Sequence, residues 1–247
     1  MGFPLMERVV YEQMAELDQR HWWYRARREV LAALIRRTVQ PPPGAKILEI
    51  GCGTGHNLRM LAGFGSVDAL ELDDEARKIA EERLGRPVMS APLPALEGVR
   101  EHHYDMIGAF DVIEHIDDDS AAIASIARRL KPGGKLVITV PAHQWMWSAH
   151  DTVNHHKRRY SKAGLKLLID GSPLKLQALG YFNSILFPVA VAERMASKAR
   201  GKDEADLKLP AGPINAALER AFAIERHLIG RVPLPPGLSL FAVASAI

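Results

Sequence analysis

The sequence lacks several features that would assign it to other protein classes. It has one cysteine, Cys52, which excludes an internal disulfide framework and leads us to expect a reducing, cytoplasmic setting. No apolar run reaches about 18 residues, so no membrane-spanning helix is expected. The first residues lack the basic start and long apolar core of a signal peptide. The net charge is only +3, which does not by itself indicate a nucleic-acid partner.

What the chain does have is enough apolar material for a full core. Of its 247 residues 47% are hydrophobic, which favours one α/β domain with additions. Residues 7–37 contain good helix formers and neither proline nor glycine, so they are expected to be helical. Pro41–Gly44 then ends this helix. We therefore expect an N-terminal helical cap over residues 1–40 and a core domain over residues 41–247.

The core domain is organised around the stretch KILEIGCGTG at residues 46–55. Its first half is typical of a buried strand in a parallel sheet, and Gly51, Gly53 and Gly55 follow at alternate positions. A side chain at these positions would hold a ligand away from the backbone, and glycine permits the positive φ of a tight turn. The next residues can begin a helix whose N-terminal amides face the ligand. The pattern predicts a nucleotide-like cofactor over this turn.

Two cofactor classes compete for this turn. The dinucleotide fingerprint G-x-G-x-x-G would need glycine at His56 or at Leu58, and both frames fail. The pattern present, E-x-G-x-G-x-G, resembles motif I of the class I S-adenosylmethionine-dependent methyltransferases, in their small-molecule branch. The resemblance implies that the turn holds the amino-acid end of S-adenosylmethionine. The cofactor residues that it implies here are Glu49, Gly51, Cys52, Gly53 and Gly55.

A second strand is expected over residues 66–73, and Glu71 stands at its tip. It falls 20 residues after Gly51, where a carboxylate can accept hydrogen bonds from both ribose hydroxyls. Asp73 could do the same, or it could cap the helix expected over residues 75–84. We expect Glu71, with its neighbour Leu72, to contact the cofactor.

Three later segments extend the resemblance. Val88-Met89 predicts a short third strand that ends at Ser90 and Ala91, where the family often offers an acid and a small residue to the adenine. A fourth strand over residues 104–110 runs into D-V-I-E-H, and the resemblance places Phe110, Asp111 and His115 at the cofactor. L-K-P-G-G-K-L precedes a fifth strand over residues 136–141. Together they imply an α/β, doubly wound, Rossmann-like sheet of seven mostly parallel strands.

The residues after the fifth strand form a long polar and aromatic stretch, which is expected at the mouth of the site. Methyl transfer to a hydroxyl needs help with proton removal, and histidine suits this near neutral pH. His150, His155 and His156 are the candidates, with Asp151 available to orient an imidazole. We expect His155 or His156 to be the base. The alternative is that these histidines only fix the loop or bind substrate.

A rival arrangement is the cluster Asp111, Glu114 and His115. It is similar to the E-x-x-E-H segment that quinone-biosynthesis O-methyltransferases use near a divalent metal. Such a cluster is also common where no metal is bound, and we expect no metal here.

The C-terminal part is expected to carry a helical insertion at about residues 183–232, before a last strand. It forms a packed lid or a homodimer contact, or it admits a lipid-like substrate or touches a membrane peripherally. His21-Trp22-Trp23-Tyr24 either packs onto the core or lines a substrate pocket, and we expect packing. Basic clusters such as those at residues 25–28 and 36–37 are either solvated faces or a rim that attracts an anion or a membrane surface.

These observations predict an S-adenosylmethionine-dependent enzyme that methylates a hydroxyl of a small molecule or of a lipid- or sugar-linked acceptor. A non-catalytic cofactor-binding or partner module is the alternative from another class, and an N- or C-methyltransferase on a small molecule is the alternative chemistry. No [N/D]-P-P-[Y/F/W] tetrapeptide follows the fourth strand, so a nucleic-acid N-methyltransferase is not expected.

Overall fold

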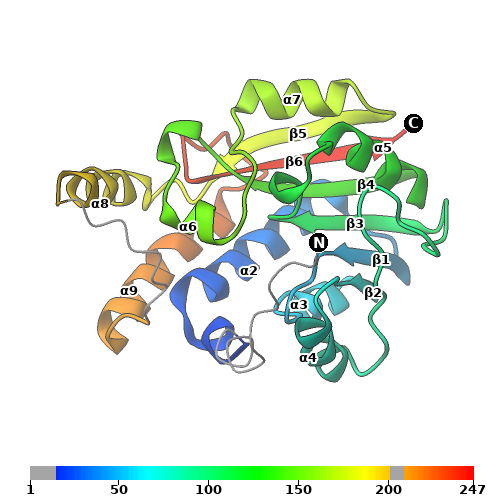
Figure 1. The fold of residues 1–247 in the computed structure, drawn as a ribbon, viewed down its shortest axis with the longest axis horizontal. Coiled ribbons are helices and arrows are strands. Elements are labelled where there is room, and N and C mark those ends of the chain that lie inside the picture. Colours follow the sequence, from blue (N-terminus) through cyan, green and yellow to red (C-terminus); the bar gives the residue numbers. More distant parts are fainter. Residues whose placement is uncertain (1–14, 201–208) are drawn as a thin grey trace.

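A computed structural model describes residues 15–200 and 209–247, and its centre is one six-stranded sheet in the order β2-β1-β3-β4-β6-β5 (Figure 1). β1, β2, β3 and β4 pair in parallel, whereas β6 runs antiparallel to both of its neighbours, β4 and β5. The strands are β1 (Ala45–Ile50), β2 (Gly65–Leu70), β3 (Tyr104–Phe110), β4 (Leu130–Pro141), β5 (Leu174–Phe182) and β6 (Ser239–Ala246).

The expected seven-stranded sheet is wrong by one strand, because Val88-Met89 does not form one. Met89 makes a single parallel bridge with Leu70, supported by backbone hydrogen bonds to Ala69 and from Glu71. Pro87 and Pro92 bracket this segment, and proline has no N–H to donate to a ladder. Pairing therefore stops after one residue.

Helices cover both faces of the sheet. They are α2 (Trp22–Leu34), α3 (Leu58–Ala62), α4 (Asp74–Leu84), α5 (Asp119–Arg129), α6 (Ala149–Val153), α7 (Lys162–Asp170), α8 (Phe187–Arg200) and α9 (Gly212–Ala223). A π-helical turn (Ile35–Val39) continues α2, and three 3₁₀ segments lie at Ile113–His115, Gln144–Met146 and Ile224–His227.

Two apolar cores result, one on each face of the sheet. Along β1, Leu48 and Ile50 belong to one core and Ile47 to the other, as the alternation of strand side chains requires. The first core also contains residues of α5 and α7, and the second contains residues of α2, α3 and α9. The doubly wound arrangement therefore follows from strands that are apolar on both faces.

The N-terminal helix is less continuous than the sequence suggests. Residues 1–14 lie outside the described part, residues 15–20 are helical, and the helix is interrupted at His21. His21 has extended backbone and its Nδ1 accepts a hydrogen bond from the Trp23 amide at 3.2 Å, so it caps α2. The helix ends at Val39, after which Gln40 has a left-handed φ of 52° and three prolines follow.

α8 and α9 lie between β5 and β6 in the chain, within the expected insertion. They stand with α6 beyond the ends of the parallel strands, at the left in Figure 1, and α9 packs against α2. Within the part of the chain that the structure describes, no helix is long and apolar enough to cross a bilayer.

Candidate functional site

The candidate site lies where the strand order reverses. β2 and β3 flank β1, so the chain enters the sheet at β1 and crosses to opposite sides of it, which leaves a crevice at the carboxyl ends of these strands. Two hollows open there, of about 280 Å³ and about 510 Å³. Asp111 and His115 line both of them, so the hollows meet at the end of β3.

The smaller hollow has a mostly apolar lining into which Glu71, Asp111 and His115 bring polar side chains. Oε2 of Glu71 accepts a hydrogen bond from the amide of Gly53 at 2.7 Å. Oε1 accepts from the amides of Leu72 at 2.8 Å and Asp73 at 2.9 Å. Three backbone donors thus hold the Glu71 carboxylate at the wall of the hollow. Asp73 instead caps α4, with Oδ1 accepting from the amides of the next turn, as its alternative interpretation predicts.

The glycine turn leaves room beside this carboxylate. Gly51 and Gly53 have positive φ of 66° and 55°. A Cβ on Gly51 would lie 2.7 Å from Cγ2 of Val112, so this glycine is required by protein packing. Nothing lies within 4 Å of a Cβ position on Gly53, so a side chain there would occupy open space. The open space at Gly53 and the carboxylate of Glu71 fit a polar, ribose-bearing ligand.

Six of the predicted cofactor residues line the smaller hollow, namely Gly51, Glu71, Leu72, Ala91, Asp111 and His115. The other predicted positions lie elsewhere. Glu49, Cys52 and Phe110 are buried beneath the turn, Ser90 is exposed outside the hollow, and Gly55 lines a different one. Burial raises the pKa of the Cys52 thiol, which agrees with a packed residue rather than a nucleophile.

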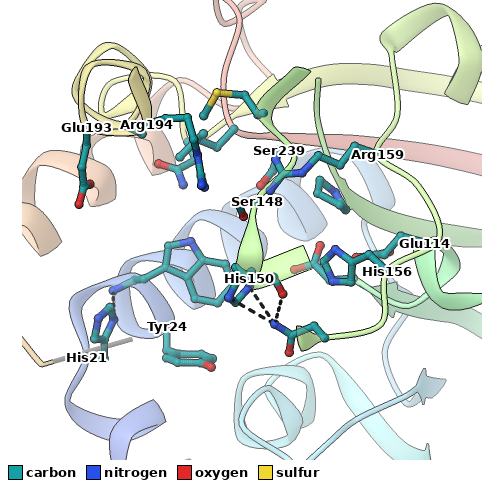
Figure 2. Close-up of a pocket in the computed structure, with 18 of the residues that line it drawn as sticks. His21, Tyr24, Glu114, Ser148, His150, His156, Arg159, Glu193, Arg194 and Ser239 are labelled. Carbon is teal, nitrogen blue, oxygen red and sulfur yellow. Dashed lines mark hydrogen bonds between the residues drawn. The ribbon is translucent and has the colours of Figure 1, made fainter. Parts of the chain in front are cut away.

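The larger hollow is enclosed by segments far apart in the chain. Figure 2 shows His21 and Tyr24 on one wall, His150, His156 and Glu114 on another, and residues of α8 on a third. All four residues of His21–Tyr24 line it. Trp22 also packs edge-on against Phe222, with ring centroids 6.2 Å apart. The segment therefore has features of both interpretations, because Trp22 and Trp23 pack against the core and all four residues line the hollow.

Asp151 is the centre of the loop that follows β4. Its side chain is fully buried and accepts hydrogen bonds from Nε and Nη2 of Arg159 at 2.8 and 2.9 Å. Nδ1 of His156 lies 2.8 Å from Asp151 Oδ1. Burial alone would raise the pKa of Asp151, but the hydrogen bonds from His156 and Arg159 outweigh it and hold the pKa below its usual range. The ionised carboxylate also accepts from the Ser148 amide and thereby caps α6.

The three predicted loop histidines are not equivalent. His156 lines the larger hollow with its Nδ1 side on Asp151. His150 lines the same hollow, and Nδ2 of Asn154 lies 3.3 Å from both of its ring nitrogens. Burial lowers the pKa of His150, so it favours the neutral form. His155 has a left-handed φ of 55°, is exposed and lines none of the hollows described here.

A buried carboxyl lies beside His156. Neither side-chain oxygen of Glu114 has a hydrogen-bond partner among the described residues. Burial, and then the charge of Asp111, raise the pKa of Glu114 well above its usual range. Burial together with His156 lowers the pKa of His115 to about 4. Ligand atoms of Glu114, His115 and His156 all lie within 4.8 Å of one another, a spacing that could hold a metal ion. Sequence reasoning had grouped Glu114 and His115 with Asp111 but not with His156.

Arg27 is a site residue that sequence reasoning missed. Its side chain is 3% exposed, and Nη2 donates to Oδ2 of Asp111 and to Oγ1 of Thr139, both at 2.7 Å. Asp111 itself has a left-handed φ of 57°. The sequence signal was a basic cluster next to the aromatic segment, and nothing in that cluster separates the one buried arginine from its exposed neighbours. Asn183, Glu193 and Arg194, which line the larger hollow from β5–α8, carried no signal.

Comparison with protein families gives one clear result. A family model described as a methyltransferase domain matches residues 22–178. The match begins at α2 and ends within β5, so it includes the loop histidines and every residue that lines the smaller hollow. The residues of α8 and β6 that line the larger hollow lie outside the matched range.

Similar proteins agree with this match, and the share of each chain that aligns differs among them. The ubiquinone biosynthesis O-methyltransferase of Thiobacillus denitrificans is 29% identical over 129 residues, which is 50% of each chain. The chain thus spans about half the length of the curated relatives it matches. A chain solved in complex with the Haloferax volcanii Trm112 methyltransferase activator has a TM-score of 0.61 at 17% identity and covers 96% of this chain and 94% of its own. Phosphoethanolamine N-methyltransferase 2 of Haemonchus contortus, solved with S-adenosyl-L-methionine, has a TM-score of 0.56 at 19% identity, over 87% of this chain and 51% of its own.

Proposed function

Because the chain belongs to the class I S-adenosylmethionine-dependent methyltransferases, we propose that it methylates a hydroxyl of a small molecule or of a lipid- or sugar-linked acceptor. The observation that carries this proposal is the meeting of two hollows at Asp111 and His115. One hollow suits the cofactor and the other is lined by titratable side chains. A methyl donor and an acceptor held in them would face each other at the end of β3.

The smaller hollow is proposed as the cofactor site. Glu71 would hold the ribose hydroxyls, Gly53 would allow close approach of the amino-acid end, and Ala91 would lie beside the adenine. When bound, S-adenosylmethionine supplies an electrophilic methyl group on a sulfonium. The apolar walls at Leu70 and Ile116 exclude water from this exchange.

His156 is proposed as the general base. With Asp151 ionised, the imidazole proton is held on Nδ1, which leaves Nε2 as an acceptor. The acceptor hydroxyl would pass its proton to Nε2 as the oxygen attacks, and Asp151 would stabilise the imidazolium that forms. His150 lines the same hollow and is assigned to substrate binding. The exposed position of His155 gives it no such role.

Single alanine replacements of the three histidines test this proposal. His156→Ala should lower kcat by about 10²- to 10⁴-fold, the usual effect of losing a general base, with the Kd for S-adenosylmethionine unchanged. His155→Ala is the matched control, since it removes the same side chain from the adjacent exposed position, and its kcat should stay near that of the unaltered protein. Unchanged kcat in His156→Ala would overturn the proposed base, whatever the other two variants show.

A metal-assisted version of the reaction has one observation in its favour. The carboxyl of Glu114 is buried without a hydrogen-bond partner among the described residues. Its ligand atom and those of His115 and His156 all lie within 4.8 Å of one another. Activity measured after exhaustive chelation separates the two versions. Full activity leaves His156 as the base, whereas loss of activity that Mg²⁺ or Mn²⁺ restores would make these three residues metal ligands.

The acceptor class is proposed from the surface beside the larger hollow. α8 contributes Glu193 to the lining and leaves Val189 and Met195 exposed by 61% and 68%, and Ile214 on α9 is exposed by 57%. These apolar side chains suit a lipid-linked acceptor or peripheral contact with a bilayer. Flotation with liposomes should carry the protein upward. Protein that stays at the bottom of the gradient would count against this acceptor. A molar mass in solution that rises with protein concentration would assign the surface to a homodimer instead.

Transfer of a labelled methyl group distinguishes the remaining alternatives. The protein is incubated with labelled S-adenosylmethionine and with acceptors that offer a phenol, an amine or a nucleophilic carbon atom. The phenol should be labelled. Label on an amine or on carbon would change the assigned atom. Tight cofactor binding without transfer to any acceptor would favour a non-catalytic module.

A further inference from the structure

A third hollow, of about 700 Å³, lies on another part of the surface from the two described above. It is enclosed by α2, α3 and the end of α4, which lie side by side in Figure 1. None of its lining residues lines either of the other two hollows. It is therefore a separate surface feature that the proposed reaction does not use.

The lining of this hollow is dominated by arginine. Arg25, Arg28 and Arg36 come from one face of α2 and its π-helical continuation, Arg59 comes from α3, and Arg83 comes from the last turn of α4. We call the cavity that these five residues line the arginine hollow. Arginine presents a planar fork of donors that matches phosphate oxygens in pairs.

Acidic side chains neutralise only part of this charge. Asp18 and Glu29 also line the hollow, but Asp18 is paired with Arg83 at 2.7 Å and Glu29 is paired with Arg226. Arg25 is paired with Glu219 at 3.1 Å.

Three of the arginines keep their charge unpaired. Within the described residues, Arg28, Arg36 and Arg59 form no ion pair. Arg36 lies over the ring of Phe64 at 5.8 Å, and Arg28 donates to the backbone oxygen of Asp18 at 3.0 Å. Three arginines without an ion pair among the described residues therefore line one hollow, and its two carboxylates, Asp18 and Glu29, are paired with other arginines.

Burial and neighbouring charges act on the groups that line this hollow. Burial is the main cause that lowers the pKa of Arg28; the charge of Asp18 opposes it, and the charges of Arg25 and Arg83 add to it. Burial and the neighbouring arginines also lower the pKa of His56 to about 3, so its ring lines the hollow in the neutral form. Nε2 of His56 is buried and has no hydrogen-bond partner among the described residues. A multiply charged anion would relieve the repulsion between the arginines.

We propose that the arginine hollow binds two phosphate groups held close together. Three arginines without an ion pair match their charge at neutral pH, and the volume exceeds what one phosphate needs. The two groups belong either to a free diphosphate or to adjacent headgroups of an anionic lipid surface, since both present phosphate oxygens. Gly55 and His56 of the cofactor turn form part of the wall, so the bound anion would contact this turn from the side opposite the cofactor.

Titration calorimetry of the full chain with sodium pyrophosphate tests the proposal. We expect one site per chain and an affinity that falls as salt is raised. The double variant Arg36→Glu/Arg59→Glu changes two exposed side chains and should weaken binding at least tenfold. Arg100→Glu is the matched control, because Arg100 is an exposed arginine outside the hollow. Thermal unfolding of each variant checks its fold, and Arg59→Glu alone replaces the double variant if that one does not fold.

Co-sedimentation with phosphatidylcholine vesicles, with and without phosphatidylglycerol, distinguishes the two sources of phosphate. If the unaltered protein binds pyrophosphate and the double variant does not, the ligand is a free anion. Binding only to phosphatidylglycerol vesicles, lost in the same variant and kept in Arg100→Glu, assigns a lipid headgroup. No binding of either probe, or binding that the double variant leaves unchanged, would overturn the proposal.

Discussion

At the scale of single residues, Glu71 carries the clearest prediction for cofactor binding. Its carboxylate is held by three amides at the wall of the smaller hollow. Glu71→Ala should raise the Kd for S-adenosylmethionine by about 10- to 100-fold, because hydrogen bonds to a charged group contribute about 1.5–3 kcal/mol. Asp74→Ala, which removes an exposed acid three positions away, should leave Kd unchanged. Equal effects of both variants in calorimetry would show that charge near the turn, rather than contact, decides affinity.

The raised pKa of Glu49 leads to a prediction of how the free energy of unfolding depends on pH. Burial raises the pKa of this carboxyl from 4.5 to about 8, and among the residues that the structure describes only Asn57 donates to it, at 2.8 Å. Between these values the folded protein holds a proton that the unfolded chain has lost, so the free energy of unfolding should fall as pH rises from about 5 to 8. Glu49→Gln keeps the acceptor for Asn57 and removes the titration.

Melting temperatures of the two proteins at pH 5 and pH 8 check this. The unaltered protein should lose more stability than the variant over this interval, by an amount of the order of a few kcal/mol. Parallel curves would show that Glu49 is ionised when buried, which would require a compensating partner.

At the scale of elements, Arg27 joins α2 to the end of β3. Its side chain is buried and forms an ion pair with Asp111, whose carboxylate is 30% exposed. Arg27→Met should lower the free energy of unfolding by about 1.5–3 kcal/mol, because a hydrogen bond to a charged group is lost while the remaining carboxylate still reaches solvent. Arg25→Met is the control, since Arg25 is half-exposed in its pair with Glu219 and such pairs contribute about 0–1 kcal/mol. Denaturant unfolding measures both, and equal losses would contradict this account.

Two elements differ from their sequence-based expectation for local reasons. Val88-Met89 has strand composition, but proline on either side limits its pairing to one bridge. The N-terminal helix has continuous helix formers, but His21 adopts extended backbone and caps a new helix. The missing N–H of proline outweighed strand propensity in the first case, and a side-chain cap at His21 began a new helix in the second.

At the scale of the whole molecule, ligand binding should stabilise the fold selectively. S-adenosylmethionine at 100 times its Kd should add about 2.7 kcal/mol to the free energy of unfolding, because it binds the folded state only. The melting temperature should rise accordingly, and NAD at the same concentration should leave it unchanged. A rise with NAD and none with S-adenosylmethionine would contradict the family assignment of the turn.

The whole fold also explains why the loop histidines separate into different roles. His150, His155 and His156 are close in sequence, yet the hydrogen-bonded centre at Asp151 turns His156 toward the larger hollow and leaves His155 in solvent. Sequence spacing placed all three at the mouth of the site. The choice among them depends on loop contacts with Arg159 and Ser148, which no local pattern encodes.

The sequence by itself determined the glycine turn, Glu71 at the tip of β2, and the strand-helix rhythm from β1 to β4, because each depends on residues that are neighbours in the chain. Only the tertiary structure decided that Arg27 reaches Asp111 across 84 positions, that Glu114 and His115 meet His156, and that five arginines from three helices share one hollow. Helix packing around the sheet brings these groups together, and side chains that are distant in the chain acquire partners, burial and shifted pKa values only when that packing is complete.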